Sequence, residues 1–331
     1  MRTPEESVRP APRVLSIAGS DPSGGAGIHA DLKSIAANGG YGMAAITALT
    51  AQSTRGVRAV HVPPVDVLVA QLDALSDDIE IDAVKIGMLA NAEVTRAVDA
   101  WLARAGAPVV VVDPVMVATS GDRLLDDDAV SALRDLLRRA DVVTPNIPEL
   151  AVLVSEPEAD TWDAVLAQAG RAAREFGVDV VAKGGHLAGA DAPDALVTAA
   201  GEVREFPGAR IATTNTHGTG CSFSSAIATR IAGGADRAGA VGEAKRWLAE
   251  SIRHGAALRV GGGSGPVSHF AGLWARGGLE TAPTPEEAAA DWWAASSEAR
   301  EAIDALPFVR GLGDGSLDRD AFVWYLAQDA L

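Results

Sequence analysis

The chain has 331 residues, of which 48% are hydrophobic and 22% are charged. It is therefore large enough for one α/β domain of about 250 residues with a smaller appendage. Its 28 basic and 44 acidic residues give a formal net charge of −16, which argues against a nucleic-acid partner, because neutralising phosphates requires a basic face.

The N-terminal segment, residues 1–12, carries three prolines and two acids where a signal peptide would have an apolar core. We expect it to be a disordered tail. The most apolar run, residues 107–118, is interrupted by Asp113 and Pro114 and is far shorter than the roughly 20 residues that span a bilayer. One cysteine cannot form an internal disulfide. These features predict a cytoplasmic protein without a membrane segment.

Short β-branched runs alternate with helical patterns along most of the chain. The strand candidates are residues 14–18, 44–49, 83–86, 109–112, 142–144 and 178–182. Helical patterns such as "VDVLVAQLDALSDD" and "DDDAVSALRDLLRRA" lie between most of them. This alternation predicts an α/β fold with a mostly parallel central sheet and helices on both faces.

The later segments predict how the domain ends. Residues 195–199 and 203–207 predict an antiparallel edge hairpin, and a helical tract over 238–260 closes the domain. The Gly- and Pro-rich stretch 261–287 indicates a boundary. We place the edge near residue 278, which leaves a main domain over 13–278 and a tail over 279–331 that opens with a helix N-cap signal at Thr284.

The stretch "NTHGTGC" places the only cysteine in the first turn of a predicted helix. Backbone N–H groups at a helix start are unpaired and favour anions, so Gly218, Thr219, Gly220 and Cys221 form a candidate anion site. The same dipole would favour a Cys221 thiolate, which would make this residue a base or a nucleophile. The alternative is that Cys221 is a small buried apolar residue in a simple turn.

A second glycine-rich turn, "AGSDPSGGAGIHADLK", follows the first strand. Residues 25–30 formally match a dinucleotide fingerprint. The match is weak, since no acidic residue follows at the distance where a ribose hydroxyl would need one. A lysine-containing phosphate loop of the Walker type is absent as well, because no lysine of the chain follows a glycine.

The helix after this turn carries an acidic residue at an unusual position. Asp31 lies at the edge of the apolar face that Ile28 and Ile35 define, where a carboxylate needs a partner. It is either a ligand-facing acceptor or a helix-N-terminal charge without a further role. Gln52 follows the second predicted strand, at the edge where open α/β sheets bind ligands.

Polar residues also end later strands. Asp113 directly follows one apolar strand, and Asn146 and Glu149 follow the next. Carboxylates at neighbouring strand ends would suit Mg²⁺, which prefers oxygen ligands and bridges to phosphates. Taken alone, Asn146 would be a turn residue and Glu149 a solvated charge. Lys183 ends another strand, where it either faces phosphates or is exposed.

Together these motifs resemble one family. The series "AGSDPSGGAGIHADLK", "TALTAQSTRGV", "DAVKIGMLA", "VVVDPVM", "TPNIPE", "KGGH" and "NTHGTGC" closely resembles the hydroxymethylpyrimidine/phosphomethylpyrimidine kinases of thiamin biosynthesis, in the ribokinase-like superfamily. The resemblance covers about residues 13–275. It implies two successive phosphorylations, of 4-amino-5-hydroxymethyl-2-methylpyrimidine and then of its monophosphate, with MgATP in a homodimer.

The resemblance also implies roles for single residues. It assigns the pyrimidine to Asp31 and Gln52, with Gly19, Met88 and Val115 around the ring. We further predict contacts to ATP at Lys183, Asn146 and Thr216, and Mg²⁺ ligands at Asp113 and Glu149. The "GTGC" segment matches the hole for the transferring phosphoryl group, and Cys221 stands where many relatives have an aspartate base.

The tail has a separate resemblance. "LPFVRGLGDGSLDRDAFVWYLAQD" looks like the opening of TenA-type thiaminase II proteins, with Leu306 in place of the usual histidine of a His-Pro-Phe sequence. The rest of that fold, including its catalytic cysteine, is not in the chain. We expect no thiaminase activity, and a tail that either packs as helices on the kinase domain or a partner subunit, or is poorly ordered.

Three other functions fit parts of the sequence. Pyridoxal also carries a hydroxymethyl group on a ring, so pyridoxal kinase activity is the nearest alternative. A non-catalytic pyrimidine-binding or regulatory module is another, although the apparent Mg²⁺ and phosphate elements argue against it. An NAD-dependent oxidoreductase would depend on the weak match at residues 25–30 alone.

Overall fold

The computed structural model describes residues 11–116, 127–276 and 285–329. The chain divides into two compact units, Met1–Thr281 and Ala282–Leu331. The expected N-terminal tail lies mostly outside the described residues, and the first strand begins at Arg13.

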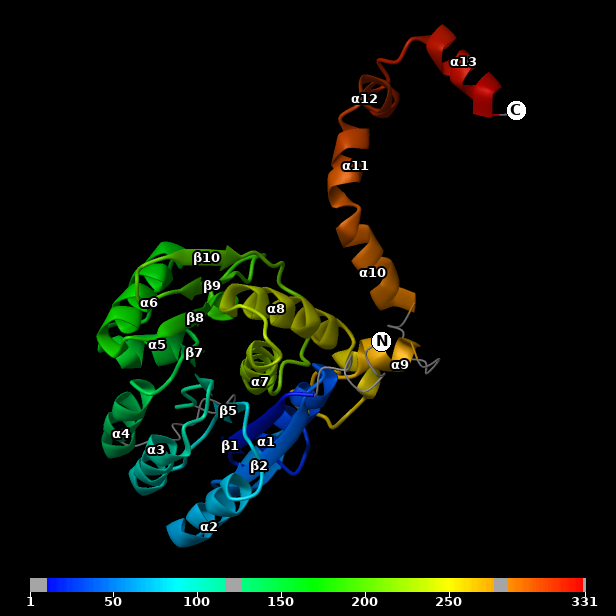
Figure 1. Ribbon diagram of the computed structural model, residues 1–331. Helices are drawn as coiled ribbons and strands as arrows, with labels where there is room; N and C mark the ends of the chain where they lie inside the picture. The colour runs from blue at the N-terminus through cyan, green and yellow to red at the C-terminus, as the bar shows by residue number, and fades with distance from the viewer. Residues whose placement is uncertain (1–10, 117–126, 277–284, 330–331) are drawn as a thin grey trace, which may run out of the picture. The chain divides into compact units, whose positions relative to one another are not determined.

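A mostly parallel sheet forms the centre of the first unit (Figure 1). Within the described residues it has eight strands in the order β10-β9-β8-β7-β6-β5-β1-β2. Their bounds are β1 Arg13–Ala18, β2 Tyr41–Ile46, β5 Ala83–Ile86, β6 Val110–Val112, β7 Val142–Val143, β8 Asp179–Lys183, β9 Asp194–Val197 and β10 Val203–Phe206. The pairs from β2 to β8 are parallel, and β9 and β10 add an antiparallel edge. The predicted α/β fold and edge hairpin are confirmed.

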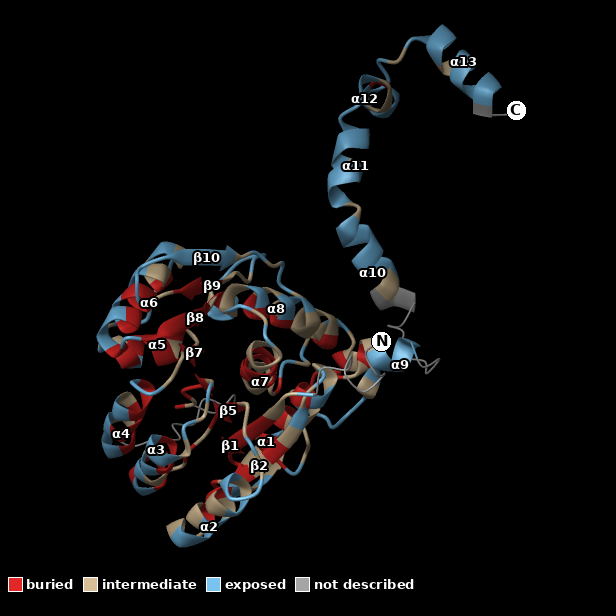
Figure 2. Ribbon diagram, viewed as in Figure 1, coloured by how far each residue is buried: buried red, intermediate tan, exposed pale blue. Residues whose placement is uncertain are grey.

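Helices cover both faces of this sheet. One face packs against α2 Val65–Ser76, α3 Ala92–Ala105, α4 Asp127–Leu137, α5 Ile147–Val154 and α6 Trp162–Phe176. The other packs against α1 Gly27–Ala37, α7 Thr219–Ala232 and α8 Arg237–Arg253. Successive strand residues serve the two layers, since Val14 belongs to one apolar cluster and Leu15 to the other. The central strands β5, β6 and β7 are accordingly buried between the helices, whereas the edge strand β10 is mostly exposed (Figure 2).

The predicted strand over residues 44–49 was wrong in one respect. β2 ends at Ile46, and a separate hairpin follows, formed by β3 Leu49–Ser53 and β4 Gly56–His61. Beyond the break, the Ala48 carbonyl accepts from Ser20 N–H (2.8 Å), which joins this segment to the turn after β1. The apolar run through residues 44–49 continues across this break, which is why sequence periodicity did not show it.

The Gly- and Pro-rich stretch is not a linker over its first half. Residues 265–269 are buried, and His217 pairs with Pro266 in a β-bridge. Ser264 N–H donates to the Thr54 carbonyl at 3.0 Å. The stretch follows a short 3-10 helix, Gly255–Leu258, and leads into α9 Ala271–Arg276. Its glycines permit close packing against the hairpin turn, because a Cβ at Gly263 would lie 2.1 Å from the Thr54 carbonyl oxygen.

The second unit is helical, with α10 Pro285–Ala295, α11 Ser297–Asp304, α12 Pro307–Asp314 and α13 Arg319–Asp329. Figure 2 shows these helices mostly exposed. Trp292, Trp293 and Trp324 are each at least 65% exposed. Among local contacts, Phe308 and Tyr325 have ring centroids 5.1 Å apart.

Candidate active site

The sequence-predicted residues follow the carboxyl ends of several parallel strands. Gly19 follows β1, Asp113 follows β6, Asn146 follows β7, and Lys183 ends β8. In a parallel sheet these ends share one edge, where open α/β folds bind ligands. The starts of α1, α5 and α7 supply further polar groups around the same residues.

The two glycine-rich turns contact each other. Gly218 has a φ of 78°, and a Cβ there would lie 1.8 Å from the Gly25 carbonyl oxygen. A Cβ on Gly25 would lie 2.3 Å from His217 Cδ2. Glycine is therefore required at both positions, because any side chain would separate the turns.

The turn before α1 holds an internal carboxylate. Asp21 accepts hydrogen bonds from Ser23 N–H and Oγ–H (2.9 and 2.7 Å), Gly25 N–H (3.2 Å) and Ala26 N–H (2.8 Å). Burial would raise the pKa of Asp21, but hydrogen bonds from His217 and Ser23 lower it to about 2. The amides that a dinucleotide phosphate would need are thus occupied by a side chain of the chain itself.

The turn before α7 is open by comparison. Among the described residues, the backbone N–H groups of Gly220 and Cys221 have no hydrogen-bond acceptor. The Thr219 N–H donates to the Thr216 carbonyl at 3.3 Å. This turn therefore offers two successive free amides at the start of a helix, as an anion site requires.

Charged side chains lie directly beside these amides. Lys183 Nζ donates to Asp113 Oδ1 at 3.0 Å, and Thr144 Oγ donates to the same oxygen at 2.9 Å. A Cβ on Gly220 would lie 3.3 Å from Asp113 Oδ2 and 3.4 Å from Lys183 Nζ. A cation, a carboxylate and two open amides therefore meet at one point.

Glu149 is buried near this point and is not the solvated charge that its position alone suggested. Its Oε2 accepts from Asn146 N–H (2.8 Å), while Asn146 Oδ1 accepts from Glu149 N–H (2.9 Å), which forms a capping box at α5. Burial raises the pKa of Glu149 to about 7, Lys183 opposes this shift and Asp113 adds to it. Burial would raise the pKa of Asp113 too, but Lys183 and Lys85 lower it.

Asp113 and Glu149 fit a Mg²⁺ site that phosphate oxygens and waters complete, better than a metal site formed by protein ligands alone. The described residues contain no group of three or more His, Cys, Asp or Glu side chains arranged for a metal. Mg²⁺ is commonly held by one or two carboxylates together with phosphate oxygens and waters. The donor set is compatible with that kind of site.

The expectation of a Cys221 thiolate was wrong. Burial raises the pKa of the thiol to about 11, and Asp31 and Asp113 add to this shift. Lys85 and a hydrogen bond from Gly27 N–H act in the opposite direction but do not reverse it. The thiol is protonated near neutral pH because two carboxylates and burial outweigh the helix start.

The residues predicted to contact the pyrimidine ring lie on different elements. Gly19 and Met88 are adjacent, since a Cβ on Gly19 would lie 2.5 Å from Met88 Cε. Gln52 lies on β3 and not at a strand end of the central sheet, and its Oε1 accepts from Thr50 Oγ at 3.1 Å. Thr50 Oγ is also 2.8 Å from the Ser20 carbonyl, which links the hairpin to the turn after Gly19. Val115 is half-buried just after Asp113.

Asp31 is fully buried and has only internal partners. Its carboxylate accepts from Lys85 Nζ (2.9 and 3.0 Å), Ser16 Oγ (2.6 Å) and Ser225 Oγ (2.8 Å). The ligand-facing acceptor that the sequence suggested is thus enclosed by β1, β5 and α7. Sequence reasoning missed Lys85, although a lysine inside the apolar strand "AVKI" is a signal for a buried ion pair.

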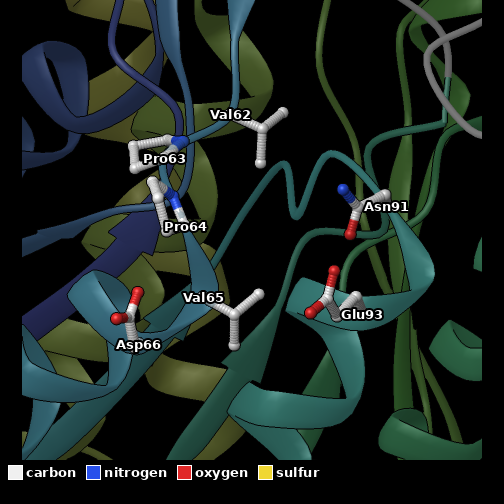
Figure 3. Close-up of a pocket in the computed structure, with 7 residues that line it drawn as sticks. All are labelled: Val62, Pro63, Pro64, Val65, Asp66, Asn91 and Glu93. Carbon is white, nitrogen blue, oxygen red and sulfur yellow. The ribbon is translucent and has the colours of Figure 1, made fainter.

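A surface hollow of about 530 Å³ lies between the starts of α2 and α3 (Figure 3). It is lined by Val62, Pro63, Pro64, Val65, Asp66, Asn91 and Glu93. None of the residues predicted from the sequence lines it. The candidate site is therefore defined by converging polar groups and not by this hollow.

An α/β fold with open amides beside a lysine and two carboxylates fits the class of proteins that bind phosphate groups at the strand ends of the sheet. Residues 21–268 match the phosphomethylpyrimidine kinase family, and the chain belongs to this family. The resemblance to that family is thus confirmed.

Several relatives are similar over most of this chain. The hydroxymethylpyrimidine/phosphomethylpyrimidine kinase of Escherichia coli is 48% identical over 78% of this chain and 98% of that protein. The thiamine biosynthesis multifunctional protein ThiED of Corynebacterium efficiens is 48% identical over 96% of this chain and 47% of that protein. The chain spans about half the length of the Corynebacterium relatives, and the match extends into its second unit.

Solved structures agree with this assignment. The phosphomethylpyrimidine kinase of Clostridium difficile has a TM-score of 0.63 at 37% identity, covering 73% of this chain and 99% of that chain. The pyridoxal kinase of Staphylococcus aureus in complex with ADP has a TM-score of 0.73 at 31% identity, covering 79% of this chain and 94% of that chain. In the described residues, no helix is long and apolar enough to cross a membrane.

Proposed function

We propose that the chain phosphorylates 4-amino-5-hydroxymethyl-2-methylpyrimidine to its monophosphate and then to its diphosphate, with ATP as the phosphoryl donor. One observation carries this proposal: the unpaired amides of Gly220 and Cys221 lie beside the Asp113–Lys183 pair. Phosphoryl transfer mainly needs alignment and stabilisation of negative charge. This arrangement supplies both without a covalent intermediate.

The roles of the phosphate-side residues follow from their positions. The N–H groups of Gly218, Gly220 and Cys221 bind the transferring phosphoryl group, and Lys183 Nζ offers its charge to the same group. Asp113 and Glu149 hold Mg²⁺, which neutralises phosphate charge when bound. Thr216 and Asn146 remain proposed contacts to ATP, although the Asn146 carboxamide oxygen already caps α5.

The pyrimidine is placed beside Gly19 and Met88, with Gln52 reading the polar edge of the ring and Val115 contacting its face. An amide can donate and accept, which suits the mixed pattern of an aminopyrimidine. Asp31 supports this pocket from inside, through Ser16, Ser225 and Lys85, instead of touching the ring.

Cys221 orients the substrate hydroxyl and is not a preformed thiolate base. Its raised pKa supports this role, and a dissociative transition state needs little help from a base. We further propose a cytoplasmic homodimer. The TenA-like character of the tail stays a prediction, although the Corynebacterium relatives match across 96% and 97% of this chain.

The test is ADP release from MgATP with three acceptors assayed in parallel: hydroxymethylpyrimidine, its monophosphate and pyridoxal. Turnover of both pyrimidines is expected. Pyridoxal is the informative alternative acceptor, because solved pyridoxal kinases share this fold at about 31% identity. Turnover of pyridoxal alone, or of none of the three, would contradict the proposal.

A further inference from the structure

His217 and Asp21 form a buried pair that joins the two glycine-rich turns. His217 Nε2 and Asp21 Oδ2 are 2.8 Å apart, and the two residues are 7% and 1% exposed. They are 196 residues apart in the chain. The roles assigned above to the ring, the phosphates and the metal use neither residue.

Each partner is fixed within its own turn. Asp21 accepts from the amides of Gly25 and Ala26, and its own N–H donates to His29 Nδ1 at 3.2 Å. His217 N–H donates to the Gly265 carbonyl at 3.0 Å. The Asp21 carboxylate and the His217 backbone are thus each held in place, so the bond between the two side chains connects two fixed segments.

The connection ends directly at the candidate anion site. Gly218 follows His217 in the chain and touches the Gly25 carbonyl, so the His217 ring sets how closely the α7 turn approaches the α1 turn. The α1 turn begins at Gly19, beside Met88, where the ring is proposed to bind. The His217–Asp21 hydrogen bond thus lies between the place proposed for the ring and the open amides, in addition to the contacts that join α1 and α7 further along the helices.

We propose that the Asp21–His217 pair is a positioning device that sets the α7 amides at the correct distance from the pyrimidine. The role rests on the proposed phosphoryl transfer. It requires a hydrogen-bond donor at the position of His217 Nε2, and it does not require a proton to leave or reach the substrate. A displacement of about 1 Å of such groups costs about 100-fold in rate.

The test compares His217→Leu, which removes the donor, with His217→Gln, which restores a donor near the Nε2 position. In His217→Leu we expect kcat to fall by about 10- to 100-fold, with the KM for hydroxymethylpyrimidine changing less than about threefold. His217→Gln should recover most of kcat. If His217 acted as an acid or base, the glutamine variant would be as slow as the leucine variant, and the proposal would be wrong.

Asp21→Asn provides a second route if the leucine variant does not fold. Its kcat loss should not add to that of His217→Leu in the double variant, because both changes break the same connection. Additive losses would overturn the proposal.

His269→Leu is the matched control. His269 is 5% exposed and lies 2.8 Å from Ser222 Oγ on α7, but it has no hydrogen bond to the α1 turn. It should lower the melting temperature while keeping kcat within about threefold of wild type. An equal loss of kcat in both leucine variants would reduce the pair to a general packing role and overturn the proposal.

Alkylation of Cys221 separates this inference from the proposed function, because it needs no substrate. Cys221 is the only cysteine and lies in the α7 turn. His217→Leu and Asp21→Asn should be labelled by iodoacetamide about tenfold faster than wild type, since a loosened turn exposes the thiol. Unchanged labelling overturns the positioning role. A wild type that labels as expected but phosphorylates no pyrimidine overturns only the proposed function.

Discussion

At the scale of single residues, burial controls the protonation of the groups around the candidate phosphate site. Burial raises the pKa of both Cys221 and Glu149, whereas Lys183 and Lys85 hold the pKa of Asp113 below its usual value. The site therefore combines one reliably ionised carboxylate with a neutral thiol. This combination suits charge stabilisation more than proton abstraction.

Replacement of the thiol tests that conclusion. We expect Cys221→Ser to keep turnover within about tenfold of wild type, since a general base contributes about 100-fold or more when it acts. Steady-state kinetics at pH 7.5 with saturating MgATP measures this. A fall beyond about 100-fold at unchanged KM would restore Cys221 as the base.

His269 predicts a specific dependence of stability on pH. Burial lowers the pKa of its imidazole to about 4, and the Lys33 charge contributes. The unfolded chain, with a pKa of about 6.5, then binds a proton more readily than the folded chain. The contribution of His269 to the free energy of unfolding is fully present above pH 6.5. About 3 kcal/mol of it is lost as the pH falls towards 4. Urea unfolding at pH 7 and pH 4.5 should show a steeper loss for wild type than for His269→Gln. An equal loss of unfolding free energy between the two pH values in both proteins would contradict the lowered pKa of His269.

At the scale of elements, one buried ion pair joins β5, α1, β1 and α7. Asp31 lies on α1 and accepts from Lys85 on β5, Ser16 on β1 and Ser225 on α7. Burial alone would lower the pKa of Lys85, but the Asp31 carboxylate raises it above its usual value. The sequence placed Asp31 at the edge of an apolar face and so predicted its need for a partner. The identity of that partner required the strand order, which brings β5 next to β1.

Removal of one partner should be more damaging than removal of both. Lys85→Met leaves an uncompensated buried carboxylate and should lower the free energy of unfolding by about 3 to 5 kcal/mol. The double variant Asp31→Asn/Lys85→Met should recover part of that loss. Arg96→Met, at the exposed pair with Asp128, serves as the control and should cost less than about 1 kcal/mol. Chemical denaturation measures all three, and a Lys85→Met variant as stable as the control would contradict the prediction.

At the scale of the whole molecule, the chain consists of an α/β unit and a helical unit that are compact separately. The α/β unit corresponds to nearly the full length of the Escherichia coli kinase, whereas the ThiED match continues into the helical unit. The candidate site residues all lie before residue 222. The second unit is therefore not needed to build the site.

A shortened chain that ends at Thr281 tests this independence. We expect it to keep kcat with hydroxymethylpyrimidine within about twofold and its melting temperature within a few degrees, because no catalytic group is removed. Scanning calorimetry and the ADP-release assay measure these quantities on both lengths of chain. Loss of turnover in the shortened chain would show that the kinase unit depends on the tail.

The alternation of strands and helices and the polar residues at strand ends were sufficient to predict the sheet and the region of the site, because parallel strands bring their carboxyl ends to one edge. Local pattern favoured residues 218–221 as the anion site over the weak match at residues 25–30, but it could not show which amides of either turn have partners. Only the tertiary structure shows that Asp21 fills one of them and leaves the amides of Gly220 and Cys221 open in the other. It also decided that Asp31 faces Lys85 and that the Cys221 thiol stays protonated. These outcomes depend on burial and on charges from distant parts of the chain, to which sequence periodicity is insensitive.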